Sequence, residues 1–201
     1  MSKLYYVYAT MNSAKSTMLL TKAHSFSERG ISFLCIKPSV DTRDGDGVIK
    51  SRIGIERECL VVDKIDNIYS IIEEYNKVSL FHGGDLLKWV LIDEAQFLTR
   101  EQVNQLSEIV DSLDINVMCF GLRTDFKTNL FEGSARLMEL SDNIEELKSS
   151  CKCGRKAIVN ARIDTFGNVV NSGEQIVIGG NDMYVPLCRK CYKEALNKAK
   201  Y

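Results

Sequence analysis

The sequence predicts an α/β fold in which helices cover both faces of a parallel sheet. Short apolar runs, typical of buried strands, occupy residues 4–9, 31–36, 89–92 and 115–120. Segments with the spacing of helices lie between these runs, and one of them follows Thr99, where Gln102 is placed to complete a capping box. Strands that alternate with helices pair in parallel, because each helix returns the chain to the same edge of the sheet.

Local signals place the other elements. Helix formers fill residues 15–29 and stop at Gly30, a residue that suits a helix end. A second helix is expected over residues 66–75, and the helix that follows Phe131 is expected to end near Lys148. Residues 41–52 are rich in Asp, Gly, Arg and Ser and predict a mobile loop. The apolar faces of the helices after Asp66 and Thr99 are predicted to contain Ile68, Ile71, Ile72, Tyr75, Val103, Leu106, Val110 and Leu113.

Composition limits the classes of function. The 201 residues are 45% hydrophobic and 26% charged, with a formal net charge of −1, so they lack the basic surplus of a general nucleic-acid binder. The first residues lack the pattern of a signal peptide, and no apolar run is long enough to cross a bilayer. We therefore expect a cytoplasmic protein with neither a nucleic-acid nor a membrane partner.

The character of the sequence changes after Ser150, where cysteines, glycines and short strand-like runs replace the alternating strands and helices. This change predicts a nucleotide-binding domain over residues 1–150 and a small second domain over residues 151–201.

A polar loop joins the first predicted strand to the first helix. A phosphate-binding loop needs backbone N–H groups at a helix N-terminus, a lysine for the β- and γ-phosphates and a hydroxyl for magnesium. Lys15 and Ser16 stand where the last two roles fall. Alanines 9 and 14 occupy the positions of the usual glycines, so the motif alone is equally compatible with an ordinary helix start. The loop consists of Ala9, Thr10, Met11, Asn12, Ser13, Ala14, Lys15, Ser16 and Thr17.

Two adjacent acids, Asp93 and Glu94, follow the strand at residues 89–92. Ligands of parallel sheets gather at the carboxyl ends of the strands. One carboxylate there can hold magnesium opposite the hydroxyl of Ser16, and the other can act as a general base toward an attacking hydroxyl. A helix-capping acid is the structural alternative. The pair favours a nucleotide phosphoryl site because it lies downstream of a Lys-Ser loop.

Four of the seven cysteines cluster near the C-terminus, at Cys151, Cys153, Cys188 and Cys191. Two close pairs separated by a loop are typical of a tetrahedral thiolate site for zinc. Four protein ligands would fill such a site, so the zinc would be structural. The alternative is four unrelated thiols. The remaining cysteines are predicted to be buried core thiols, and these are Cys35, Cys59 and Cys119.

The segment between the cysteine pairs has little core of its own. A zinc ion that holds both of its ends makes it a pinned loop able to close over a small substrate. A plain zinc ribbon with turns is the alternative interpretation.

Taken together, these motifs resemble the cytosolic, zinc-containing (type II) thymidine kinases across nearly the whole chain. Each motif is weak alone, but their order and spacing are specific. The residues that carry the resemblance are Lys15-Ser16-Thr17, Lys37-Pro38, Asp41-Thr42-Arg43, Asp93–Phe97, Gly121–Phe126, Leu130-Phe131, the four clustered cysteines, and Val177–Gly180 followed by Tyr184.

The resemblance implies a P-loop (RecA-like) parallel sheet with a small zinc-binding lasso domain. It also implies transfer of the γ-phosphoryl group of ATP to the 5′-hydroxyl of thymidine, with deoxyuridine as a possible acceptor, in nucleotide salvage. Glu94 would be the catalytic base, Asp93 would lie with Ser16 near Mg²⁺, and Arg43 would lie near the transferred phosphate. The residues implied to contact the nucleoside are Phe97, Leu122, Phe126, Phe131, Val177, Ile178, Gly179 and Tyr184. A homotetramer and feedback inhibition by thymidine triphosphate are implied as well.

Two other functions remain open at this point. A RecA-like ATPase shares the loop and the strand-end acids, and DNA-stimulated hydrolysis indifferent to thymidine would favour it. A zinc-ribbon binding module with a degenerate nucleotide fold is the non-enzyme alternative, which Ala14 keeps open. Failure to bind magnesium nucleotide would favour that module.

Overall fold

A six-stranded parallel sheet forms the centre of the chain in a computed structural model, which describes residues 1–42, 45, 47–176 and 183–198. The strand order is β5-β2-β6-β7-β1-β8, and every neighbouring pair is parallel. The strands are β1 (Leu4–Ala9), β2 (Phe33–Pro38), β5 (Leu60–Val62), β6 (Trp89–Ile92), β7 (Asn116–Leu122) and β8 (Asn143–Leu147). Because they are parallel, their carboxyl ends share one edge, where β7 separates β1 from β6.

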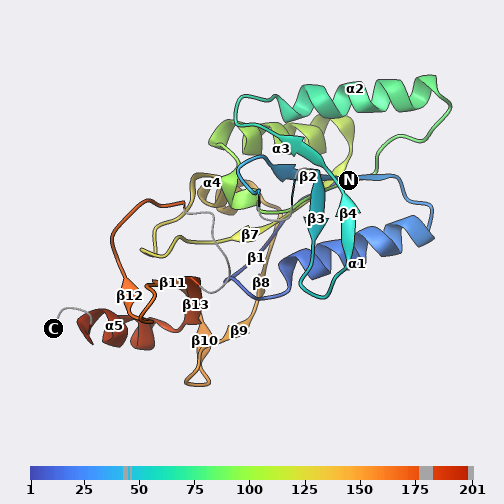
Figure 1. Ribbon diagram of the computed structural model, residues 1–201. Helices are drawn as coiled ribbons and strands as arrows, with labels where there is room; N and C mark the ends of the chain where they lie inside the picture. Colours follow the sequence, from blue (N-terminus) through green and yellow to red (C-terminus); the bar gives the residue numbers. More distant parts are fainter. Residues whose placement is uncertain (43–44, 46, 177–182, 199–201) are drawn as a thin grey trace.

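Helices cover both faces of this sheet, as the sequence predicts (Figure 1). Helix α1 (Lys15–Glu28) packs on one face, and α3 (Arg100–Leu113) and α4 (Glu132–Leu140) pack on the other, with α2 (Ile68–Phe81) outside α3. Successive residues along a strand point to opposite faces of the sheet. Val90 and Ile92 belong to the core under α3, whereas Leu91 belongs to the core under α1. The capping box of Thr99 and Gln102 begins α3 as predicted.

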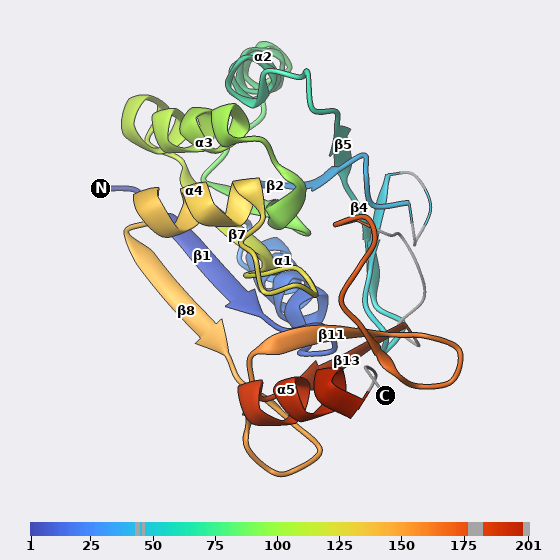
Figure 2. The ribbon, with the colours of Figure 1, turned by 90° about the vertical axis from the view of Figure 1, so that its left-hand side faces the viewer.

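A smaller group of elements lies beyond the carboxyl ends of β1 and β8 (Figure 2). Its strands β11 (Val159–Ile163), β12 (Val169–Val170) and β13 (Tyr184–Leu187) form an antiparallel sheet, and β9 (Ser149–Ser150) pairs with β10 (Lys156–Ala157). With α5 (Arg189–Lys198) they enclose a third hydrophobic cluster, separate from the two of the main sheet. The Tyr192 hydroxyl donates a 2.7 Å hydrogen bond to the Phe126 carbonyl and ties α5 to the loop after β7.

The predicted end of one helix and part of one predicted loop were wrong. The helix after Phe131 ends at Leu140 rather than near Lys148, because Ser141 and Asp142 turn the chain into β8, the edge strand that pairs with β1. Part of the predicted loop 41–52 is a strand, β3 (Val48–Lys50), which forms a hairpin with β4 (Glu56–Glu58). The Lys37 ammonium lies under this hairpin and donates to the carbonyls of Gly45 and Val48.

The second helix begins and ends later than predicted, and Tyr75 lies exposed on it rather than on the buried face. Cys35 and Cys119 are buried as predicted, and Cys59 is half-buried. Among the described residues, no helix has the length and apolar character that crossing a bilayer requires.

Candidate active site

The loop after β1 wraps the N-terminus of α1. Ala14, the residue before the helix, adopts a left-handed conformation with φ 59° and ψ 25°, and Asn12 has φ 65°. These angles turn successive N–H groups to one side, which is the geometry that binds anions. Lys15 is buried, and its ammonium donates a 3.0 Å hydrogen bond to the Thr10 carbonyl across the loop.

Asp93 lies at the end of β6 and faces this loop. The Ser16 hydroxyl donates a 2.7 Å hydrogen bond to Asp93 Oδ2, so the two predicted magnesium ligands are adjacent. Burial, and then the neighbouring Glu94 carboxylate, raises the pKa of Asp93 above its ordinary value, although Ser16 and Lys15 oppose that rise. A divalent cation suits this place because it would stabilise the ionised carboxylate. The oxygen donors present fit Mg²⁺, which prefers carboxylate and hydroxyl ligands.

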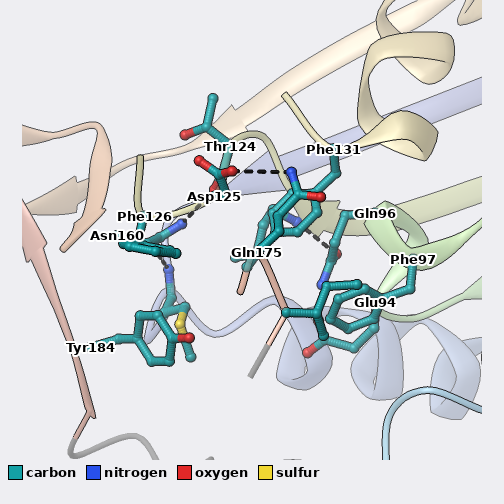
Figure 3. A pocket seen from close by; sticks show the side chains of 13 residues that line it. Glu94, Gln96, Phe97, Thr124, Asp125, Phe126, Phe131, Asn160, Gln175 and Tyr184 are labelled. Atoms are coloured by element: carbon teal, nitrogen blue, oxygen red, sulfur yellow. Dashed lines mark hydrogen bonds between the residues drawn. The ribbon is translucent and has the colours of Figure 1, made fainter. Parts of the chain in front are cut away.

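Glu94 begins the short 3₁₀ helix η1 (Ala95–Phe97) with φ 49°. A left-handed angle at a non-glycine residue costs about 1 kcal/mol or more, and such strain is concentrated at functional sites. The turn separates the directions of the two acids. Asp93 contacts the phosphate loop through Ser16. Glu94 instead lines the pocket beside Gln96 and Phe97 (Figure 3).

The pocket encloses about 520 Å³ of empty space, part of it open to solvent. Figure 3 shows Glu94 and Phe97 at one end and Phe126 and Tyr184 at the other. Phe97 and Phe131 meet edge to face with ring centroids 5.9 Å apart. The lining residues that the sequence predicts are Glu94, Phe97, Leu122, Phe126, Phe131 and Tyr184, together with Met11, which was predicted for the phosphate loop instead. Aromatic walls with a few polar groups are typical of sites for small molecules.

Six further lining residues were not predicted from the sequence, and they are Gln96, Thr124, Asp125, Asn160, Gln175 and Ile176. Asn160 on β11 accepts a 2.7 Å hydrogen bond from the Met11 N–H and donates to the Thr124 carbonyl at 3.2 Å. The side-chain amide of Gln175 donates to Asp125 at 3.0 Å. Gln96, Thr124 and Asp125 stand within motifs already noted, so their neighbourhood was the available signal. Nothing local marks Asn160.

Arg162 supports the wall formed by Phe126 and Tyr184. Its guanidinium carbon lies 3.7 Å from the centroid of the Phe126 ring, and its Nη2 and Nε donate to the Tyr184 hydroxyl at 2.8 and 3.1 Å. Stacking on an aromatic face compensates a buried guanidinium in part. Arg162 thus holds both aromatic side chains of this wall in place.

The four clustered cysteines converge near the N-terminus of α5. Their Sγ atoms all lie within 4.8 Å of one another, and those of Cys153 and Cys188 are 3.6 Å apart. A tetrahedral site with metal–sulfur bonds of about 2.3 Å requires sulfur atoms about 3.8 Å apart, so these thiols fit a zinc ion. Because all four positions are taken by protein ligands, such an ion would be structural.

Four predicted binding residues lie outside the described residues, namely Arg43, Val177, Ile178 and Gly179. Their roles stay predictions, as do those of the other site residues.

Comparison with known proteins identifies the family. The family model described as thymidine kinase matches residues 2–192. The chain belongs to the thymidine kinase family. A thymidine kinase of Rhodopirellula baltica is 47% identical over 196 residues, which cover 98% of this chain and 90% of that protein. Thymidine kinases of Photobacterium profundum and Legionella pneumophila are 45% and 48% identical, over 98% and 96% of this chain and 100% and 90% of their own lengths.

One solved structure, the Pif1 helicase from Candida albicans, aligns with 74% of this chain and 36% of its own. With a TM-score of 0.44 and 16% identity, that similarity supports no argument about this thymidine kinase family member.

Proposed function

We propose that this chain transfers the γ-phosphoryl group of ATP to the 5′-hydroxyl of thymidine, with Glu94 as the general base. Membership of the thymidine kinase family makes it a kinase of thymidine. The single observation that supports the role of Glu94 is its position, where the pocket lined by aromatic residues meets the phosphate loop. A nucleoside in that pocket would present its 5′-hydroxyl to the carboxylate.

The triphosphate would lie along residues 9–17. Backbone N–H groups at the start of α1, Lys15 and Arg43 would bind its oxygens. Ser16 and Asp93 would hold Mg²⁺, which when bound neutralises charge on the β- and γ-phosphates. Glu94 would accept the proton of the 5′-hydroxyl as that oxygen attacks the γ-phosphorus. Asp93 and Glu94 are consecutive, but one faces the phosphate loop and the other faces the pocket. The strained turn at Glu94 would therefore bring the phosphoryl donor, ATP, close to the phosphoryl acceptor, the nucleoside.

The nucleoside would lie between Phe97 and Phe131 at one end and Phe126 and Tyr184 at the other. The lasso residues Val177 to Gly179 would complete the contact with the base. Zinc bound by the four cysteines would hold the ends of this segment. A cytoplasmic location, a homotetramer and feedback inhibition by thymidine triphosphate complete the proposal. The homotetramer and the feedback inhibition rest on the family resemblance alone.

Substituting Glu94→Gln tests the base. The variant keeps the size and polarity of the side chain but accepts no proton, so we expect normal folding and a loss of about 100-fold or more in kcat. Turnover with thymidine and magnesium ATP, measured beside the thermal melting curve, separates chemistry from folding. A folded variant with near-wild-type turnover would remove Glu94 as the base.

A further inference from the structure

Gln96 lies between the carboxyl ends of β6 and β7, beside the pocket. It belongs to η1, is 2% exposed and lines the pocket next to Glu94 (Figure 3). Its amide nitrogen donates a hydrogen bond to Glu94 Oε2, and its Oε1 accepts a 2.9 Å hydrogen bond from the backbone N–H of Leu122 on β7. One side chain therefore connects the acid after β6 to the end of the neighbouring strand.

The orientation of the Gln96 amide is determined by these partners. The Leu122 N–H can only donate, so it must meet the carbonyl oxygen of Gln96. The NH₂ group is then directed at the carboxylate, which can only accept when ionised. A flipped amide would place donor against donor and acceptor against acceptor.

Gly121 on strand β7 makes room for the side chain of Gln96. A Cβ atom at Gly121 would lie 2.8 Å from Gln96 Oε1 and 3.1 Å from its backbone nitrogen, so a larger residue at Gly121 would displace the amide. The same strand then offers the Leu122 N–H one residue later. The missing side chain of Gly121 and the N–H donor of Leu122 together hold Gln96 in this position.

We propose that Gln96 is a positioning residue that holds the Glu94 carboxylate toward the 5′-hydroxyl of the bound nucleoside. This inference rests on the proposed role of Glu94 as the base. A charge-assisted hydrogen bond to the amide restricts the Glu94 carboxylate to one rotamer. Gln96 itself touches neither reacting atom in this account, so its effect should appear in kcat rather than in thymidine KM.

The first test replaces Gln96 by Leu, which removes both hydrogen bonds at similar size. We expect kcat to fall roughly 10- to 100-fold, the range for a lost hydrogen bond to a charged group, with little change in thymidine KM. Gln102→Leu is the matched control. Gln102 is equally buried, but its amide caps α3 and binds the Asp63 carbonyl, so its loss should lower Tm and leave kcat unchanged.

Gln96→Glu gives a second readout. When protonated, the introduced carboxyl can donate to Glu94 and accept from Leu122 as the amide does. When ionised, it repels Glu94 and the donor is lost. The activity of this variant relative to wild type should therefore fall as the pH rises, toward that of Gln96→Leu. Asp93 and Lys15 are the other charged groups nearby, and both are present in wild type, whose pH profile is therefore the reference for their contribution.

Combining Gln96→Leu with Glu94→Gln completes the test, and we expect no loss beyond that of Glu94→Gln alone. If Glu94→Gln is inactive but folded Gln96→Leu keeps wild-type kcat, or Gln96→Glu keeps the wild-type pH profile, the inference is overturned and the proposed function stands. If Glu94→Gln stays active, the proposed function fails and this inference with it. Should Gln96→Leu not fold, the pH profile of Gln96→Glu decides alone, because that variant keeps the acceptor for Leu122.

Discussion

Ala14 carries backbone strain where phosphate loops usually carry glycine. Its φ of 59° costs an alanine about 1 kcal/mol or more, whereas glycine adopts this angle freely but loses about 0.4–1 kcal/mol through its more flexible unfolded state. We therefore expect Ala14→Gly to leave the free energy of unfolding unchanged or raise it by up to about 1 kcal/mol. Denaturant melts measure this. Ala23→Gly, in the interior of α1, should instead destabilise the protein. Equal losses from both substitutions would rule out strain at Ala14.

The raised pKa of Asp93 predicts a pH-dependent stability. Between the ordinary pKa of an aspartate and the raised one, the folded chain holds a proton that the unfolded chain has lost. The free energy of unfolding therefore falls as the pH rises through this window and stays lower above it. Asp93→Asn removes this titration but keeps an acceptor for Ser16, so its Tm relative to wild type should increase from about pH 4 to about pH 8 without metal or nucleotide. A Tm difference between Asp93→Asn and wild type that does not change with pH would contradict a raised pKa at Asp93.

At the scale of elements, what the sequence predicts depends on whether the signal is local. The capping box of Thr99 and Gln102 and the strand-end acids are local, and both were predicted correctly. Helix α4 was predicted too long, because the parallel pairing of β8 with β1, which ends the helical region at Ser141, is a distant interaction. The contact of Asn160 with Met11 joins residues 149 positions apart, so no pattern along the chain marks it.

The elements around the cysteine cluster give a prediction of their own. Strands β11 and β13 supply pocket residues, and β13 leads directly into Cys188 at the start of α5. Cys188→Ala should lose bound zinc, loosen these elements and weaken thymidine binding more than nucleotide binding, because the phosphate loop belongs to the main sheet. Metal analysis and separate titrations with thymidine and ATP measure this. Cys35→Ala, in the main core, should keep the zinc. A folded Cys188→Ala that binds thymidine normally would contradict this role.

At the scale of the whole molecule, two parts of the chain meet at one site. The main sheet supplies the phosphate loop and both acids at its carboxyl edge, and the C-terminal elements supply Asn160, Gln175 and Tyr184. Neither part encloses the pocket alone. This arrangement explains why the small antiparallel sheet, beside which the four cysteines converge, lies against the carboxyl ends of β1 and β8 (Figure 2).

A coupled assay of the purified protein with magnesium ATP, offering each of the four common deoxynucleosides in turn, tests the proposed phosphoryl transfer to thymidine. We expect turnover with thymidine and none with the other three, because the aromatic pocket and the lasso would select the base before the 5′-hydroxyl meets Glu94. A folded, zinc-containing protein that turns over none of the four, or that hydrolyses ATP equally with and without thymidine, would contradict it.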